Sequence, residues 1–374
     1  MRREDRMSFR QYLAASGVAL FSSVSRLLPR VVLESAGFSG WLAPLAALPL
    51  LIGLVWLMGR LLTVEGRKVG LAESLLVRLG PWGGRIVGAL LALWLVFYGG
   101  VVLRSGGERI LATVYPGAGL PLFLGGGLFL SLVFALGRLQ WAGRNAFVTL
   151  LLFVGILAVV LSAALPSLRW EYLWPPNLNR WSGIGHGALW AADILSPWVW
   201  FSFLRGRVTQ DEGAFPRAVR SVLLLCLITL LFLLATIGDL GPELALRQQF
   251  PFYVMIKNLR LLNLMERFDA VIVVLWMTTD YVFIGMLLYS ASAALHFLSG
   301  SRKREGWVLL CALGMLASAL FSGCNAFRFA WVSERLIPAL NLGLTFFLLP
   351  VIALFPAKKE NSQFSKKGVD KRFW

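Results

Sequence analysis

Three charged side chains of this sequence stand inside long apolar segments, where charges are rare: Arg26, Asp193 and Asp280. A charge at the centre of a bilayer costs roughly 2.5–3.5 kcal/mol, so such residues usually face the interior of a helix bundle. A buried arginine can hold a ligand carboxylate through two parallel hydrogen bonds, and a buried carboxyl group can carry a proton. The three charges therefore predict a polar centre within a membrane that binds a small molecule or transfers a proton.

Hydroxyl and aromatic side chains accompany these charges. Serines precede Arg26, a serine and a tryptophan flank Pro197, a tyrosine stands in another apolar segment, and a threonine and a tyrosine lie close to Asp280. For the serine before Pro197 and for the threonine, the alternative is a hydrogen bond back to their own helix, and for the tryptophan it is packing against lipid. The candidate ligand-binding residues are Ser22, Ser23, Ser25, Arg26, Tyr98, Asp193, Ser196, Trp198, Thr278, Asp280 and Tyr281.

The composition indicates what positions these side chains. The chain has 374 residues, of which 58% are hydrophobic and 15% charged, whereas a soluble domain is nearer half apolar and a quarter charged. Apolar runs long enough to cross about 30 Å of hydrocarbon recur along the chain, and they must be helices because lipid offers the backbone no hydrogen-bond partner. We predict an all-α integral membrane protein with ten transmembrane helices, at 11–32, 41–62, 86–107, 120–137, 146–165, 184–204, 219–238, 268–297, 307–325 and 336–356.

These helices divide into two sets of five. Pro29 interrupts the first apolar segment and Pro197 the sixth, so each half begins with a helix that we expect to be broken. Paired interrupted helices in matching places indicate a 5+5 inverted-repeat transporter fold with a ligand site at the middle of the membrane. The alternative is that both prolines only kink their helices. The predicted organisation is one membrane domain over 1–356, with repeats at about 11–165 and 184–356, and a basic tail over 357–374.

The net charge of +17 is distributed unevenly. If the amino terminus is cytoplasmic, about two thirds of the 36 lysines and arginines fall in cytoplasmic loops and in the tail. This positive-inside bias predicts a multi-pass membrane protein with both termini in the cytoplasm. Attraction to anionic membrane lipid explains the basic tail, so we expect no nucleic acid partner.

Catalytic and metal-binding patterns are missing from the sequence. It contains no phosphate-binding loop with Gly-x-x-x-x-Gly-Lys, no Gly-x-Ser-x-Gly elbow and no paired catalytic histidines. His186 and His296 have no cysteine or carboxylate at ligand spacing, and the three cysteines form no Cys-x-x-Cys pair. We therefore expect no enzyme activity, no cofactor and no metal site.

Four stretches carry a resemblance to a known family. They are "LLPRVVLESAGFSGWLAPL", "LVRLGPWGGRIVGALLALWLVFYGGVVLRSGGERI" with Tyr98, Arg104 and Glu108, "AGRNAF", and "FPFYVMIKNLRLLNLMERFDAVIVVLW". In this order the chain resembles the spore germination permeases, the B subunits of bacterial endospore germinant receptors, in the amino acid–polyamine–organocation transporter superfamily. It departs from the family pattern at Ser22 and Val24, where the family often has glycines before the proline of the first span.

The resemblance implies ten helices in the inverted-repeat fold and a ligand pocket between spans 1, 3, 6 and 8, with Tyr98 as a ligand contact. It also implies a place in the spore inner membrane and two partners, an A subunit with its own membrane part and a lipoprotein C subunit. The expected ligand is a small germinant such as an amino acid. Two other functions stay open: a proton- or sodium-coupled amino acid transporter, and a scaffold subunit with a degenerate pocket.

The charges of the predicted centre allow two roles. In the first, Arg26 pairs with Asp193 or Asp280 when the site is empty, and a germinant changes this pairing. In the second, the pair is a permanent buried ion pair that fixes the register of the helices.

Overall fold

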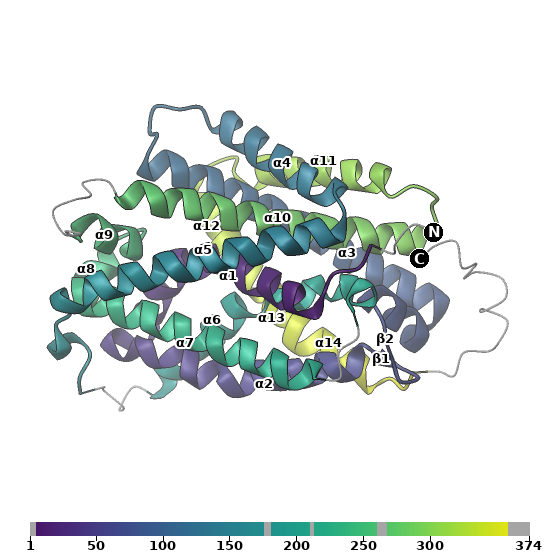
Figure 1. The fold of residues 1–374 in the computed structure, drawn as a ribbon, viewed down its shortest axis with the longest axis horizontal. Coiled ribbons are helices and arrows are strands. Elements are labelled where there is room, and N and C mark those ends of the chain that lie inside the picture. The colour runs from purple at the N-terminus through teal and green to yellow at the C-terminus, as the bar shows by residue number, and fades with distance from the viewer. Residues whose placement is uncertain (1–4, 176–180, 210–212, 260–267, 358–374) are drawn as a thin grey trace.

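The computed structural model describes residues 5–175, 181–209, 213–259 and 268–357, and this part of the chain is almost entirely helical. Most helices run along the long axis of the molecule (Figure 1). A two-stranded antiparallel ribbon, β1 (Thr63–Val64) with β2 (Arg67–Lys68), lies at one end of the bundle. The short helices α8 (Pro242–Arg247) and α9 (Pro251–Asn258) lie at the opposite end. The all-α class is therefore confirmed.

The long helices agree with the predicted apolar segments to within a few residues at most ends. Short 3₁₀ turns follow α1 and α5, and a longer 3₁₀ helix, η5 (Pro197–Arg207), follows α6. The last segment is one helical run, Ala326–Leu354, that contains two π-helical turns. The helices are α1 (Phe9–Ala36), α2 (Ala43–Leu61), α3 (Leu71–Thr113), α4 (Leu120–Leu136), α5 (Leu139–Ala164), α6 (Trp181–Leu195), α7 (Ala214–Leu240), α10 (Phe268–Ser299), α11 (Glu305–Ser322), α12 (Ala326–Trp331), α13 (Ile337–Leu342) and α14 (Leu349–Leu354).

Length and apolar composition identify seven helical stretches within the described residues that can cross a membrane. They are Ser23–Leu61, Leu71–Thr113, Leu139–Ser167, Ala214–Leu240, Ala270–Ser299, Glu305–Ser322 and Ala326–Leu354. The first stretch joins the second half of α1 to α2, and α4 and α6 have only 17 and 15 residues. The structure is thus that of a multi-pass membrane protein, while the number of ten spans stays a prediction.

Pro29 does not interrupt the first helix, contrary to the prediction. The 28 residues of α1 form one α-helix with Pro29 inside it. A proline removes a single hydrogen bond, and Ser22 and Val24 stand where glycines would make the helical backbone easier to unwind. The sixth segment, in contrast, is broken as predicted, because α6 ends at Leu195 and the 3₁₀ helix η5 begins at Pro197.

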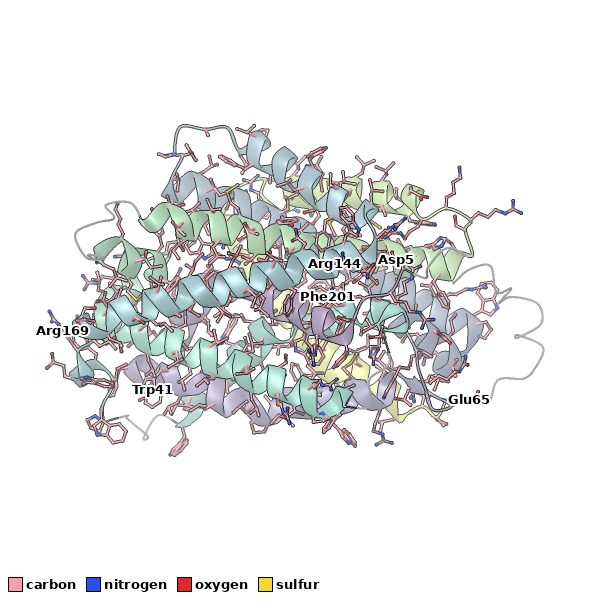
Figure 2. The ribbon with its side chains drawn as sticks, in the orientation of Figure 1. Asp5, Trp41, Glu65, Arg144, Arg169 and Phe201 are labelled. Carbon is pink, nitrogen blue, oxygen red and sulfur yellow. The ribbon has the colours of Figure 1, made fainter. Side chains whose placement is uncertain are left out.

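Local contacts fix where α1 and α5 begin. Ser8 and Gln11 form a reciprocal capping box at the start of α1, which satisfies two amide groups there. Asp5 accepts hydrogen bonds from the first two amides of α5, at 2.8 and 3.2 Å, and Figure 2 shows it close to Arg144 of that helix. Between Asp5 and Ser8, Met7 forms a parallel bridge with Val208, the residue that follows η5. The bridge ties the chain before α1 to the chain that leaves the sixth segment.

Each of the first four segments packs against the segment five places later. Thus α1 contacts α6, α2 contacts α7, α3 contacts α10, and α4 contacts α11. This pairing is the one that two repeats of five spans in opposite orientation would bring about, although the repeat boundaries stay a prediction. Small residues let α3 and α10 approach closely, and Phe201 of η5 is fully buried between them and α1 (Figure 2). The helices that carry the predicted charges therefore meet inside one bundle.

Candidate functional site

A buried hydrogen-bond network stabilises the break between α6 and η5 in the sixth segment. Because Pro197 has no amide hydrogen, the carbonyl of Asp193 loses its α-helical partner. It accepts instead from the Ser196 hydroxyl at 3.1 Å and from the Nδ2 group of Asn341 on α13, also at 3.1 Å. The same amide donates to Oδ1 of Asp193 at 2.8 Å and to the Ser196 hydroxyl at 3.2 Å. Trp200 donates to Oδ1 of Asn341 at 2.9 Å. Asn341 is fully buried and joins the two halves of the broken segment to the last span.

Asp280 forms an ion pair with Arg109 of α3. Their side chains are 10% and 2% exposed, so the pair is almost completely removed from solvent. The Arg109 guanidinium also lies 5.0 Å from the ring centre of Trp276, whose indole donates to the Ser25 hydroxyl at 2.7 Å. The ion pair and this hydrogen bond together tie α10 to α3 and α1.

Gly106 explains how the Asp280 carboxylate fits between the helices. A Cβ atom at this position would lie 2.9 Å from Oδ2 of Asp280, closer than real Cβ contacts allow without movement. The glycine in "SGGERI" therefore has a packing role, since it opens the surface of α3 to the carboxylate.

Arg26 of α1 and Tyr98 of α3 lie within electrostatic range of each other inside the bundle. The side chain of Arg26 keeps intermediate exposure. Within the described residues Arg26 makes no hydrogen bond or ion pair, and Arg109, Asp280 and Tyr98 lie within electrostatic range of it. Tyr98 stacks on Trp94 at 5.5 Å, and it interacts electrostatically with both Arg26 and Asp193. The structure thus brings together a cation from α1, a hydroxyl from α3 and a carboxylate from α6.

The predicted pairing of Arg26 with an aspartate is therefore wrong. Asp280 pairs with Arg109, and Oδ1 of Asp193 binds an amide. The sequence analysis did not predict Arg109 or Asn341 as residues of the site. Arg109 lies just beyond the predicted end of the third span, next to Glu108, where a charge is expected at the headgroups. Asn341 is a polar residue within the last apolar segment, which is a signal that could have identified it.

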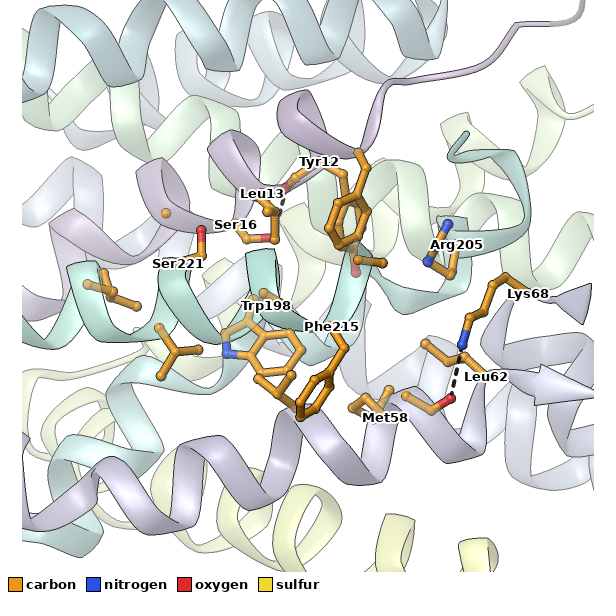
Figure 3. A pocket seen from close by; sticks show the side chains of 18 residues that line it. Tyr12, Leu13, Ser16, Met58, Leu62, Lys68, Trp198, Arg205, Phe215 and Ser221 are labelled. Carbon is orange, nitrogen blue, oxygen red and sulfur yellow. Dashed lines mark hydrogen bonds between the residues drawn. The ribbon is translucent and has the colours of Figure 1, made fainter. Parts of the chain in front are cut away.

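Several predicted site residues lie elsewhere. Thr278 donates to the carbonyl of Val274, so the alternative of a hydrogen bond within its own helix applies to it. Tyr281 donates to Asn145 of α5 on another side of α10. Trp198 lines a separate pocket beside α2 and α7 (Figure 3).

The predicted serines have different positions. Ser25 is buried against Trp276. Ser196 donates to the carbonyl of Asp193 at 3.1 Å, so the alternative of a hydrogen bond back to its own helix applies to it, and it also accepts from Asn341 at the break. Ser23 is half-buried, and the side chain of Ser22 lies outside the described residues. No group of three histidine, cysteine or acidic side chains that could hold a metal ion occurs in the described part of the chain.

Comparisons with known proteins concern the family and the fold of the chain. The sequence profile of the family described as spore germination protein matches residues 10–325. Two solved structures are similar in fold. The structure of MhsT in complex with L-phenylalanine gives a TM-score of 0.63 at 14% identity, covering 94% of this chain and 98% of that one. The structure of Mhp1, a nucleobase-cation-symport-1 family transporter in a closed conformation with bromovinylhydantoin bound, gives 0.60 at 13% identity, covering 94% and 80%.

No curated protein matches the chain in sequence. At such low identity the two structural likenesses concern the fold alone. They confirm the transporter-type architecture that was predicted from the paired proline-containing segments.

Proposed function

The chain belongs to the family of spore germination proteins, and from this premise we propose that it is the membrane subunit of a germinant receptor, which binds a small germinant between α1, α3 and α6. The proposed germinant is an amino acid. Binding would shift an equilibrium between two arrangements of the helices, which requires only that the ligand bind one arrangement better than the other.

The observation that carries this proposal is that Arg26, inside the bundle, has no hydrogen-bond or ion-pair partner within the described residues. Arg26 can hold a carboxylate through two parallel hydrogen bonds. Oδ1 of Asp193 is occupied by Asn341, while Oδ2 accepts no hydrogen bond within the described residues and can hold an ammonium group. A cation on α1 and a carboxylate on α6, each within electrostatic range of Tyr98, match the two charged ends of an amino acid.

The remaining parts of the proposal concern location and partners. We place the protein in the spore inner membrane with both termini in the cytoplasm, as the distribution of basic residues favours. The proposed partners are the A and C subunits of the receptor, to which the change in helix arrangement would be passed.

The test is a germinant screen on spores that lack this subunit and regain it as wild type or as a variant. Arg26→Gln should raise the germinant concentration needed for half-maximal response by about tenfold or more, because a charge-assisted hydrogen bond is lost. Tyr98→Phe should raise it by a smaller factor. Thr278→Ala is the matched control, because this hydroxyl bonds to its own helix and should leave the response unchanged.

A normal response of spores carrying Arg26→Gln to every germinant would refute the binding site. If, in addition, Tyr98→Phe and Asp280→Asn leave germination intact while deletions in the loops abolish it, the protein is a scaffold subunit.

Transport of the ligand is the second candidate function, favoured by the likeness to Mhp1, whose description names it a transporter. A proton- or sodium-coupled transporter should accumulate labelled amino acid in proteoliposomes when an ion gradient is imposed. A receptor should bind the amino acid without accumulating it. Retention in the vesicles that vanishes with Arg26→Gln would establish transport through the same site.

A further inference from the structure

A second pocket lies at the end of the bundle that carries β1 and β2, separate from the polar centre. Its empty volume is about 870 Å³, including the space open to solvent, and it lies between the start of α1, the end of α2, the start of α7 and η5 (Figure 3). Its walls are mostly apolar, with Leu13, Met58, Val222 and Leu225 among them. An apolar pocket of this volume can hold the acyl chain of a lipid, and the surrounding bilayer consists of such lipids.

Two cations line one side of this pocket, and neither has an acidic partner among the residues that the structure describes. Figure 3 shows Arg205 and Lys68 on the same side, and every residue that lines the pocket is neutral or basic. Arg205 is only 5% exposed; its Nη1 donates to the carbonyl of Val208 at 3.3 Å, while its Nη2 has no hydrogen-bond partner within the described residues. The guanidinium otherwise lies 5.2 Å from the ring centre of Phe9.

Lys68, too, has no counter-charge within residues 5–175, 181–209, 213–259 and 268–357. Its Nζ donates to the Thr63 hydroxyl at 2.6 Å and to the carbonyl of Gly59 at 3.5 Å, which leaves one of its three donors for a ligand. Burial, and after it the Arg205 cation, lower the pKa of Lys68. Two cations that repel each other, with no carboxylate beside them in the described part of the chain, form a site for an anion.

We propose that this pocket binds one anionic phospholipid of the surrounding leaflet, with its phosphate against Arg205 and Lys68 and one acyl chain along the apolar walls. Basic pockets between helices on the cytoplasmic side of a membrane are suited to anionic headgroups, and the basic loops predict that this end is cytoplasmic. The basic tail of the chain carries the wrong charge to occupy the site. A free phosphate would leave the apolar walls uncovered. The bound lipid would lie against α1, α7 and η5 and so link the leaflet to the helices of the central site.

The test is native mass spectrometry of the purified full-length protein, released from micelles that contain equal amounts of phosphatidylglycerol and phosphatidylcholine. One phosphatidylglycerol should remain bound, about tenfold more often than phosphatidylcholine, because the charge-assisted contacts favour the anionic headgroup. Lys68→Gln and Arg205→Gln should each lower this retention. Gly59→Leu leaves both cations in place and should lower it too, since open space surrounds a Cβ at Gly59, beside the pocket.

Arg220→Gln is the matched control, because Arg220 is an exposed cation of α7 that does not line the pocket, and it should retain lipid like the wild type. Thermal unfolding of every variant establishes whether it is folded. If Arg205→Gln does not fold, the variants Lys68→Gln and Gly59→Leu are sufficient to test the proposal. Equal retention of the two lipids, or unchanged retention in both of these variants, overturns the proposal. Displacement of the lipid by millimolar inorganic phosphate would show that the site is one for free phosphate instead.

Discussion

Removing one partner of the ion pair between Arg109 and Asp280 should destabilise the protein strongly, even though the intact pair adds little net stability compared with apolar side chains. With the two side chains 2% and 10% exposed, removal of one charge leaves the other buried without its ion-pair partner, which destabilises a protein by about 3–5 kcal/mol. Asp280→Asn keeps one oxygen that can accept a hydrogen bond, and the Trp276 ring still contacts the guanidinium. We therefore expect a loss near the lower limit, about 3 kcal/mol.

The assay follows the folded fraction by circular dichroism in mixed micelles as the proportion of dodecyl sulfate rises. The double variant Arg109→Met with Asp280→Leu should regain at least half of the lost stability, because apolar side chains of similar volume can replace a buried pair. The control is Glu34→Gln, since the Arg30–Glu34 pair has an N–O distance of 2.8 Å but side chains that are 43% and 52% exposed. Its loss should stay below about 1 kcal/mol. The reasoning fails if Asp280→Asn is as stable as the wild type, or if the double variant is less stable than the single one.

Three other substitutions test the contacts around the site in the same assay. Asn341→Leu removes the amide that bonds both to the Asp193 carbonyl and to its carboxylate, and it should cost about 2–3 kcal/mol, whereas unchanged stability would mean that another group supports the break. Gly106→Ala forces Asp280 to move and should cost about 1–3 kcal/mol; a neutral result would show that the carboxylate has room. Trp276→Phe removes the indole donor of the hydrogen bond to Ser25 and should lower the free energy of unfolding by about 1 kcal/mol. An unchanged unfolding midpoint would contradict this expectation.

The sequence predicted the helices well because the length and hydropathy of a segment are local properties. It predicted the partners of the charges poorly because these depend on which helices meet. Asp280 stood out within its apolar segment, but nothing near it in sequence indicates Arg109, 171 residues away. The two prolines show the same limit. Pro197 breaks its helix where Ser196 and Asn341 both donate to the carbonyl of Asp193. Pro29, with Ser22 and Val24 before it, stays inside a continuous helix.

The unbroken first helix has a mechanical consequence. A helix divided at its middle lets one half pivot while the other stays still, but α1 is a single rod that carries Arg26 near its centre. A ligand that tilts α1 through Arg26 would therefore move both ends of the helix, at both membrane surfaces. At the amino-terminal surface the amide of Met7 donates to the carbonyl of Arg207 at 3.1 Å, and the amide of Thr209 donates to Met7 at 2.9 Å. The amino-terminal end of α1 is thus bonded to the chain that leaves η5, and a movement of one of them would move the other.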